Sequence, residues 1–172
     1  MKKLFATSLF VIATGTFAFA QEKKLINSTV MPAKASIQAE PSLMIVNGQK
    51  TTSKTLILSD EKIAEMRVHK KGTPEAKKHD PKGEKNVALL STKPGTVLAK
   101  YEQILNQFNI PASQRNLKIS INRTGLVNPE LILADLSEIK KVEVTEAGAR
   151  EFAQWGWNPG DKFLNIITKK QD

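Results

Sequence analysis

The 172-residue chain contains no cysteine, and it has only two histidines, two tryptophans and one tyrosine. The absence of cysteine excludes disulfides, thiol nucleophiles, zinc–thiolate sites and iron–sulfur clusters. It also excludes the cysteine that a bacterial lipoprotein carries directly after its signal sequence. We therefore expect a fold that is stabilised by packing alone.

The sequence also lacks the motifs of nucleophilic catalysis, with no G-x-S-x-G and no S-x-x-K in a suitable setting. His69 and His79 match no metal-binding template, and lysines near His79 would repel a cation. We expect both histidines to be solvated. Two converging carboxylates could serve glycoside hydrolysis, but nothing singles out a pair. We therefore expect no enzyme, no cofactor and no metal.

The first twenty residues have the pattern of a secretory signal. Lys2 and Lys3 precede an apolar stretch, and the small-x-small site Ala18-Phe19-Ala20 follows it. The alternative is an uncleaved membrane anchor, but the stretch is shorter than the roughly 20 apolar residues that span a bilayer. No other segment predicts a membrane span. We expect a bacterial protein in the periplasm, secreted, or on the cell surface.

Basic residues outnumber acidic ones by 26 to 17, and removal of the two signal lysines lowers the net charge from +9 to +7. Such a balance favours anionic surroundings, or serves only solubility. Lysines gather in the predicted loop Gly72–Lys85 and just before it, where they could dock an anionic polymer or be merely solvated. Because no aromatic residues interleave with them, we expect no nucleic-acid partner. These lysines are Lys70, Lys71, Lys77, Lys78, Lys82 and Lys85.

The region after the signal repeats one pattern twice. The first copy reads LMIVNG, LSDEKIAEMRV and VALLSTK, and the second reads LKISIN, LADLSEIKKVEV and FLNIITKK. Aligning Asn47 with Asn122 places Ile63 on Ile139 with one residue of slippage. A repeat of this length indicates two supersecondary units that bury their apolar faces together. Strand-like alternation mixed with short helical turns predicts an α+β fold.

The chain divides into five segments on this pattern. We expect two strand–helical turn–strand–strand repeats, joined by an amphipathic helix over Val97–Phe108. A short strand is expected around Ile26–Val30 in an otherwise flexible leader. The segments are the signal peptide 1–20, the leader 21–40, repeat one 41–94, the linker helix region 95–112 and repeat two 113–172.

Trp155 and Trp157 are the most distinctive side chains, in a predicted long loop over Gly148–Lys162. At i and i+2 of an extended segment they would face the same way. They could stack on a sugar ring or anchor a protein partner, and we name them as candidate partner-binding residues. The alternative is that they fold over the sheet and close the core.

Three short motifs carry a family resemblance. PSLMIVNGQK at Pro41–Lys50, IAEMRVHKKG at Ile63–Gly72 and VALLSTK at Val87–Lys93 resemble the plug domain of TonB-dependent outer-membrane receptors of the Bacteroidetes type. The second copy is similar at Ile119–Leu126 and Leu164–Lys170. The chain ends where the receptor's barrel would begin, so we expect only the plug-like fold to carry over. The family's plug has no catalytic residues to transfer.

The resemblance implies an exported, non-catalytic interaction module of the bacterial envelope, associated with an outer-membrane receptor system. Its partner would be an envelope protein, bound through an exposed sheet edge or through the tryptophan loop. The alternative is a secreted binder of an anionic glycan that uses the basic loop and the tryptophan pair. Loss of binding with salt would distinguish the glycan from a protein partner.

Overall fold

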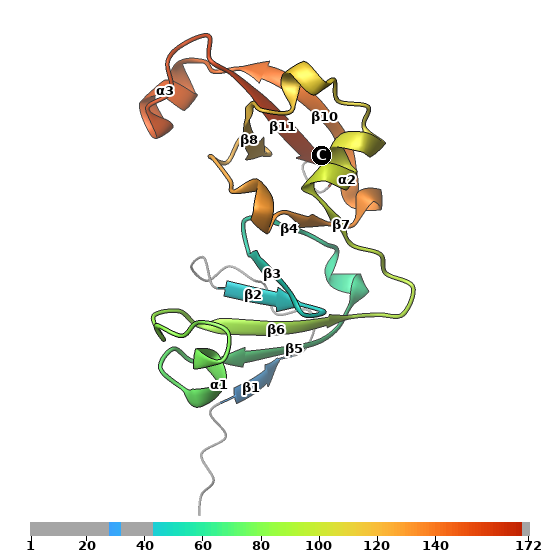
Figure 1. Cartoon of the computed structure of the whole chain (residues 1–172), viewed down its shortest axis with the longest axis vertical. Coiled ribbons are helices and arrows are strands. Elements are labelled where there is room, and N and C mark those ends of the chain that lie inside the picture. Colours follow the sequence, from blue (N-terminus) through green and yellow to red (C-terminus); the bar gives the residue numbers. More distant parts are fainter. Residues whose placement is uncertain (1–27, 32–42, 170–172) are drawn as a thin grey trace, which may run out of the picture.

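The computed structural model describes residues 28–31 and 43–169 (Figure 1). The predicted signal peptide lies outside the described residues, as does most of the predicted leader. Sheets of mixed strand direction combine with short helices, which confirms the α+β prediction. Figure 1 shows a five-stranded sheet in the lower half and a three-stranded sheet in the upper half, with β4 and β7 between them.

The five-stranded sheet contains the first half of the chain, in the order β1-β5-β6-β2-β3. Strand β2 runs parallel to β6, and the other neighbours are antiparallel. A 3-10 turn, η1 (Asp60–Lys62), leads into β5, and the Ser59 side chain caps it by accepting from the Glu61 N–H. The strands are β1 (Ser28–Met31), β2 (Leu43–Val46), β3 (Gln49–Thr52), β5 (Ile63–His69) and β6 (Val87–Thr92).

The second half forms a three-stranded sheet in the order β10-β11-β8. Its strands are β8 (Lys118–Ile121), β10 (Ile139–Glu146) and β11 (Lys162–Thr168). Strand β8 is parallel to β11, and β10 is antiparallel to it. The helical elements of this half are α2 (Tyr101–Gln107), η2 (Ala112–Gln114), η3 (Pro129–Leu131), η4 (Leu136–Glu138) and α3 (Ala149–Trp155).

The two halves use the same pairings: β2, β5 and β6 in the first correspond to β8, β10 and β11 in the second. Each parallel pair ends at an asparagine with positive φ, 49° at Asn47 and 52° at Asn122. Asn47 bonds the side chain and N–H of Thr92 (2.8 and 3.2 Å), and Asn122 bonds Thr168 in the same way (2.8 and 2.9 Å). The asparagine side chain thus satisfies backbone and hydroxyl groups where each ladder ends.

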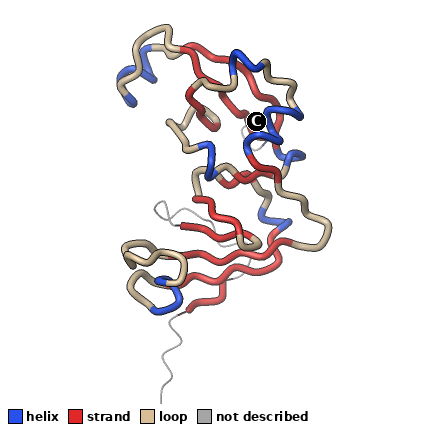
Figure 2. The backbone as a smooth tube through the Cα atoms, viewed as in Figure 1, coloured by secondary structure: helices blue, strands red, loops and turns tan. Residues whose placement is uncertain are grey.

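A small third sheet joins the halves. Its strands are β4 (Leu56–Ile57), β9 (Leu133–Ala134) and β7 (Ala99–Lys100), in the order β4-β9-β7. The Leu133 N–H donates to the Thr55 carbonyl (3.1 Å), and the Asp135 N–H donates to the Ile57 carbonyl (2.8 Å). Figure 2 shows these short strand segments between the two larger sheets.

Each half has its own hydrophobic core, except that one residue of the second half lies in the core of the first. The upper core packs α2 against the second sheet through Ile104, Leu105, Leu164 and Ile166, all fully buried. The lower core gathers one face of the first sheet and includes Leu133, which comes from the second half. The first unit therefore completes its core with a residue supplied by the second.

The linker helix begins later than predicted. Val97 was expected on its apolar face, but it is 78% exposed, and α2 starts at Tyr101. Ala99 and Lys100 instead pair with β9 in the small sheet, and Ala99 is buried there. The buried residues of α2 belong to the core of the second half, so the helix is part of that unit.

Both predicted long loops contain a helix. Within Gly72–Lys85, α1 (Pro74–Lys77) is capped by Thr73, whose hydroxyl accepts from the Ala76 N–H (3.3 Å). Ala76 is fully buried against the lower sheet, beside Ile45 and Val87. Within Gly148–Lys162, residues 149–155 form α3. At four and seven residues, these helices are too short to show a clear helical period in the sequence.

Candidate functional site

The tryptophan pair does not have the predicted geometry. Trp155 is the last residue of α3, so the two tryptophans do not share one extended segment. Trp157 is only 3% exposed, and its ring meets Phe163 edge-on at 4.6 Å and 66°. The ammonium of Lys118 lies 5.7 Å from the same ring. Trp157 therefore closes the core around Phe163 and does not present an exposed face to a partner.

The prediction that His69 is solvated is wrong. His69 lies opposite Val87 on the sheet face that α1 covers, and it is 7% exposed. Its Nδ1 has no hydrogen-bond partner among the described residues. His79 is half-buried in the segment after α1. Within residues 28–31 and 43–169, no group of three or more histidine and acidic side chains could hold a metal ion.

The six lysines in and before the basic loop are all exposed. Acidic residues lie among them, and Asp80 accepts a hydrogen bond from the Lys85 N–H (2.8 Å). Asn86 accepts from the Lys71 N–H (2.9 Å), which fixes one end of the loop to the other. The loop is thus a tethered, solvated surface of mixed charge with a basic excess.

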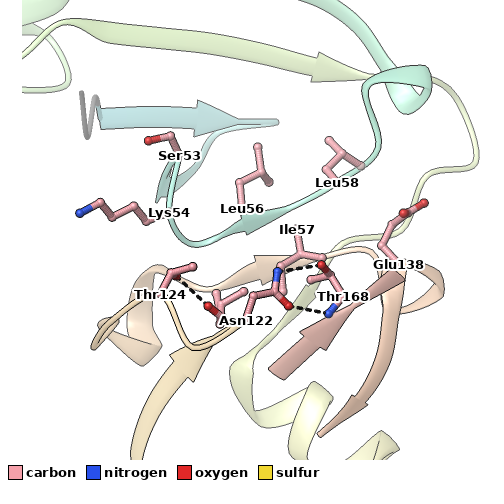
Figure 3. Close-up of a pocket in the computed structure, with 10 residues that line it drawn as sticks. Ser53, Lys54, Leu56, Ile57, Leu58, Asn122, Thr124, Glu138 and Thr168 are labelled. Carbon is pink, nitrogen blue, oxygen red and sulfur yellow. Dashed lines mark hydrogen bonds between the residues drawn. The ribbon is translucent and has the colours of Figure 1, made fainter. Parts of the chain in front are cut away.

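A cavity of about 350 Å³ lies between the two halves, beside β4 (Figure 3). Its wall includes Asn122 and Thr168, which hydrogen-bond to each other, and Thr124, whose hydroxyl donates to the Ile121 carbonyl (2.7 Å). Leu56 and Ile57 line the opposite side. Asn122, Thr168 and Thr124 already serve the fold, and the charged lining residues Lys54 and Glu138 lie on opposite sides of the cavity in Figure 3. These side chains therefore do not converge on one point.

Buried charge in the second half is also committed to structure. The Glu151 side chain is 0% exposed and pairs with Arg123, whose Nε donates at 2.7 Å. Its second oxygen accepts from the Gly148 N–H (3.0 Å). Burial raises the pKa of the Glu151 carboxyl, but the hydrogen bonds from Arg123 and from backbone N–H groups outweigh it and hold the pKa below 4.5. Both carboxylate oxygens are engaged, which ties α3 to the turn after β8.

An ion pair connects the halves next to the small sheet. Lys62, at the end of η1, bonds Asp135, and its ammonium also donates to the Ser137 hydroxyl (2.8 Å). Burial raises the pKa of the Asp135 carboxyl, but hydrogen bonds from Lys62 and Ser137 outweigh it and hold the pKa below 3.8. The hydrogen bond to Asp135 raises the pKa of Lys62. The pair is therefore charged at neutral pH.

These two acids predict a loss of stability in acid. Because each pKa is lowered in the folded state, the unfolded chain binds the proton more tightly. Their contribution is complete above the ordinary values of 4.5 and 3.8, and it is lost as the pH falls through the lowered values. We expect the midpoint temperature of thermal unfolding to decrease once the pH is lowered below about 4.5. Asp135→Asn and Glu151→Gln should each flatten that fall in a pH series of thermal melts, and an unchanged slope in both would contradict the assignment.

One surface available for binding is the edge of a sheet. Strand β10 is eight residues long, and along it the structure pairs only β11. Its equivalent in the first half, β5, has β6 on one side and β1 on the other. Among the described residues, no strand occupies the position at β10 that β1 occupies at β5. Val142 is half-buried there, whereas the equivalent Met66 is buried. Val144 and its equivalent Val68 are both half-buried.

The direction of the backbone groups on β10 follows from its neighbours. The Ile166 carbonyl accepts from the Asn122 N–H on the β8 side (2.9 Å), so the polar backbone groups of Ile166 point away from β10. Val142 lies opposite Ile166, so its own N–H and C=O point outward from the sheet. By the two-residue period of a strand, Val144 does the same. The edge therefore presents donors and acceptors ready for another strand.

The repeat alignment placed β10 on β5, but it contained no signal that only β5 would gain a further strand. No protein-family model, curated protein or solved structure matches this chain. Within the described part of the chain, no helix has the length and apolar character needed to cross a membrane. The candidate site therefore rests on the geometry of the β10 edge.

Proposed function

We propose that the protein is an exported, non-catalytic plug-like module of the bacterial envelope that binds an envelope protein by strand addition at β10. One observation carries the proposal: β10 is open at the edge that β1 covers on the equivalent strand β5. Strand addition uses main-chain hydrogen bonds for affinity and side-chain pockets for specificity. The fold itself already uses this mode once, between β1 and β5.

Other features support the same function. The signal-like first twenty residues point to export, and the short motifs resemble the plug of TonB-dependent receptors. Lys62, Asp135, Arg123 and Glu151 are engaged in structural ion pairs. These charged side chains are therefore engaged in the fold, and we assign the binding role to the open edge of β10.

The alternative, a binder of an anionic glycan, retains the exposed lysines of the basic loop. It loses one of its two stacking platforms, because Trp157 is buried against Phe163. The edge-binding function is therefore the better supported of the two.

The test is capture of a protein from envelope extract by the mature chain, with and without a blocked edge. Val144→Pro removes an outward N–H that the internal ladder does not use, and Val144→Ala is the matched control that keeps it. We expect salt-tolerant capture by the parent and the alanine variant, and loss with proline. Thermal melts check that both variants fold.

A variant of the basic loop separates the alternatives. Lys77→Glu with Lys78→Glu should leave capture unchanged if the β10 edge binds the partner. Capture that falls steeply with salt and disappears in this variant, while Val144→Pro retains it, would favour the glycan and reject the edge.

A further inference from the structure

The β10 edge carries a pattern that is complementary to itself. We propose that the strand added to β10 is β10 of a second copy, so that the protein forms a two-fold symmetric dimer with a sheet continuous across both protomers. The inference rests on the proposed function, since it uses the same open edge, and it names the partner. The added strand runs antiparallel, with Val142 of each protomer opposite Val142 of the other.

The backbone supports this register. Val142 points its N–H and C=O outward, so two facing Val142 residues can exchange both hydrogen bonds on the two-fold axis. A symmetric pair needs the same patch on both copies, which is the requirement of a two-fold interface. The β1–β5 pair shows the corresponding contact within this chain, where Met31 lies opposite Met66. Met66 is the residue of β5 that corresponds to Val142.

The side chains select this register. With Val142 on the axis, Lys141 of each copy lies opposite Glu143 of the other, in the pairs where side chains approach most closely. Within one protomer these two side chains already form an ion pair at 2.6 Å on the exposed face. A shift that placed Glu143 on the axis would set two carboxylates against each other, which is unfavourable. Charge thus favours the register centred on Val142.

Apolar surface favours it as well. Val142 and Val144 pack against the upper core but remain half-buried at the edge. A second β10 would cover Val142, as β1 flanks the buried, equivalent Met66 in the first half.

The first half provides an internal control. At the positions equivalent to Lys141 and Glu143, strand β5 carries Glu65 and Arg67, which form an ion pair at 2.7 Å on an exposed face. Strand β1 already occupies the outer side of β5. Reversal of a charge on β5 should therefore leave the oligomeric state unchanged.

The experiment is sedimentation velocity of the mature chain over a concentration series. We expect a monomer–dimer equilibrium for the parent, and dimer affinity about tenfold weaker in Lys141→Glu and in Glu143→Lys, because each places like charges opposite one another. The double variant carrying both changes should recover the parent affinity. An equimolar mixture of the two single variants should form a heterodimer, since their edges are complementary. Arg67→Glu is the matched control and should behave as the parent.

Three results would overturn the dimer: a parent that stays monomeric at every concentration, single variants that dimerise like the parent, or a double variant that remains as weak as the singles. Val144→Pro, once thermal melts show that it folds, distinguishes the two proposals. A monomeric parent whose envelope partner is still lost on Val144→Pro rejects the second copy as occupant and leaves strand addition standing. A parent dimer that Val144→Pro does not weaken rejects β10 as its interface.

Discussion

Replacing Phe163 with alanine is expected to lower the free energy of unfolding by about 3–5 kcal/mol, as for other large aromatic residues in a core. Phe163 is fully buried at the start of β11, and with Ala147 and Trp157 it forms a separate cluster. The substitution removes the ring that meets Trp157 edge-on and leaves a cavity beneath the indole. Two neighbours lose their packing at once, so little collapse can offset the loss.

Urea unfolding followed by Trp fluorescence measures this effect. Phe108→Ala is the matched control, because Phe108 is only partly buried at the end of α2. We expect it to cost clearly less than Phe163→Ala. A small or absent loss in Phe163→Ala would contradict a stabilising role for the Trp157 cluster.

Leu133→Ala is expected to cost about 2–5 kcal/mol and to loosen the first half more than the second. Leu133 belongs by sequence to the second half, but its buried side chain lies in the core of the first, with Met44, Met66 and Leu90. Truncation creates a cavity at the contact between the halves, while the β4–β9 backbone pairing remains. The first sheet then keeps its strands but loses the residue that closes its inner face.

Hydrogen exchange read by strand tests this directly. In Leu133→Ala, amides of β2 and β6 should exchange faster relative to those of β11. Leu131→Ala, two residues away and only half-buried, is the control and should leave this ratio unchanged. Uniform acceleration across both sheets in Leu133→Ala would contradict a unit-specific role.

Local patterns predicted most of the strands. The apolar run at Leu43–Val46 and the alternation through Ile119 and Ile121 correspond to β2 and β8. The short helical turns of the two repeats correspond to η1 and η4, which Ser59 and Asp135 cap. These features depend on neighbours in sequence, which is why a single sequence reveals them.

Features that depend on tertiary contacts were not predicted from the sequence. His69 alternates onto the face opposite Met66, which sequence alone assigns to solvent, but α1 covers that face through Ala76. Val97 matches a helical period by coincidence, because Ala99, two residues later, belongs to a strand that pairs with β9. Trp157 was predicted in a loop and available to a partner, but its ring packs against Phe163. In each case a tertiary contact decides the environment: Ala76 and Phe163 lie only seven and six residues from His69 and Trp157, whereas β9 is far from Ala99 in sequence.

The β10 edge illustrates the same limit from the other side. The repeat alignment placed Ile139 on Ile63. Whether a strand edge is open depends on which strands pair, and the sequence of a single strand does not determine its pairing. Only the five-stranded order of the first sheet against the three-stranded order of the second reveals it. That the two units are plug-like stays a prediction.

The position of Leu133 also sets an order in time. A ribosome makes β2, β5 and β6 well before it reaches β9, so the nascent first half lacks Leu133 in its core. Its completion waits for a contact of long sequence separation, which slows folding relative to local contacts. If the signal-like first twenty residues direct export of the unfolded chain, slower completion of the amino-terminal half would give that half more time to cross the membrane before it folds.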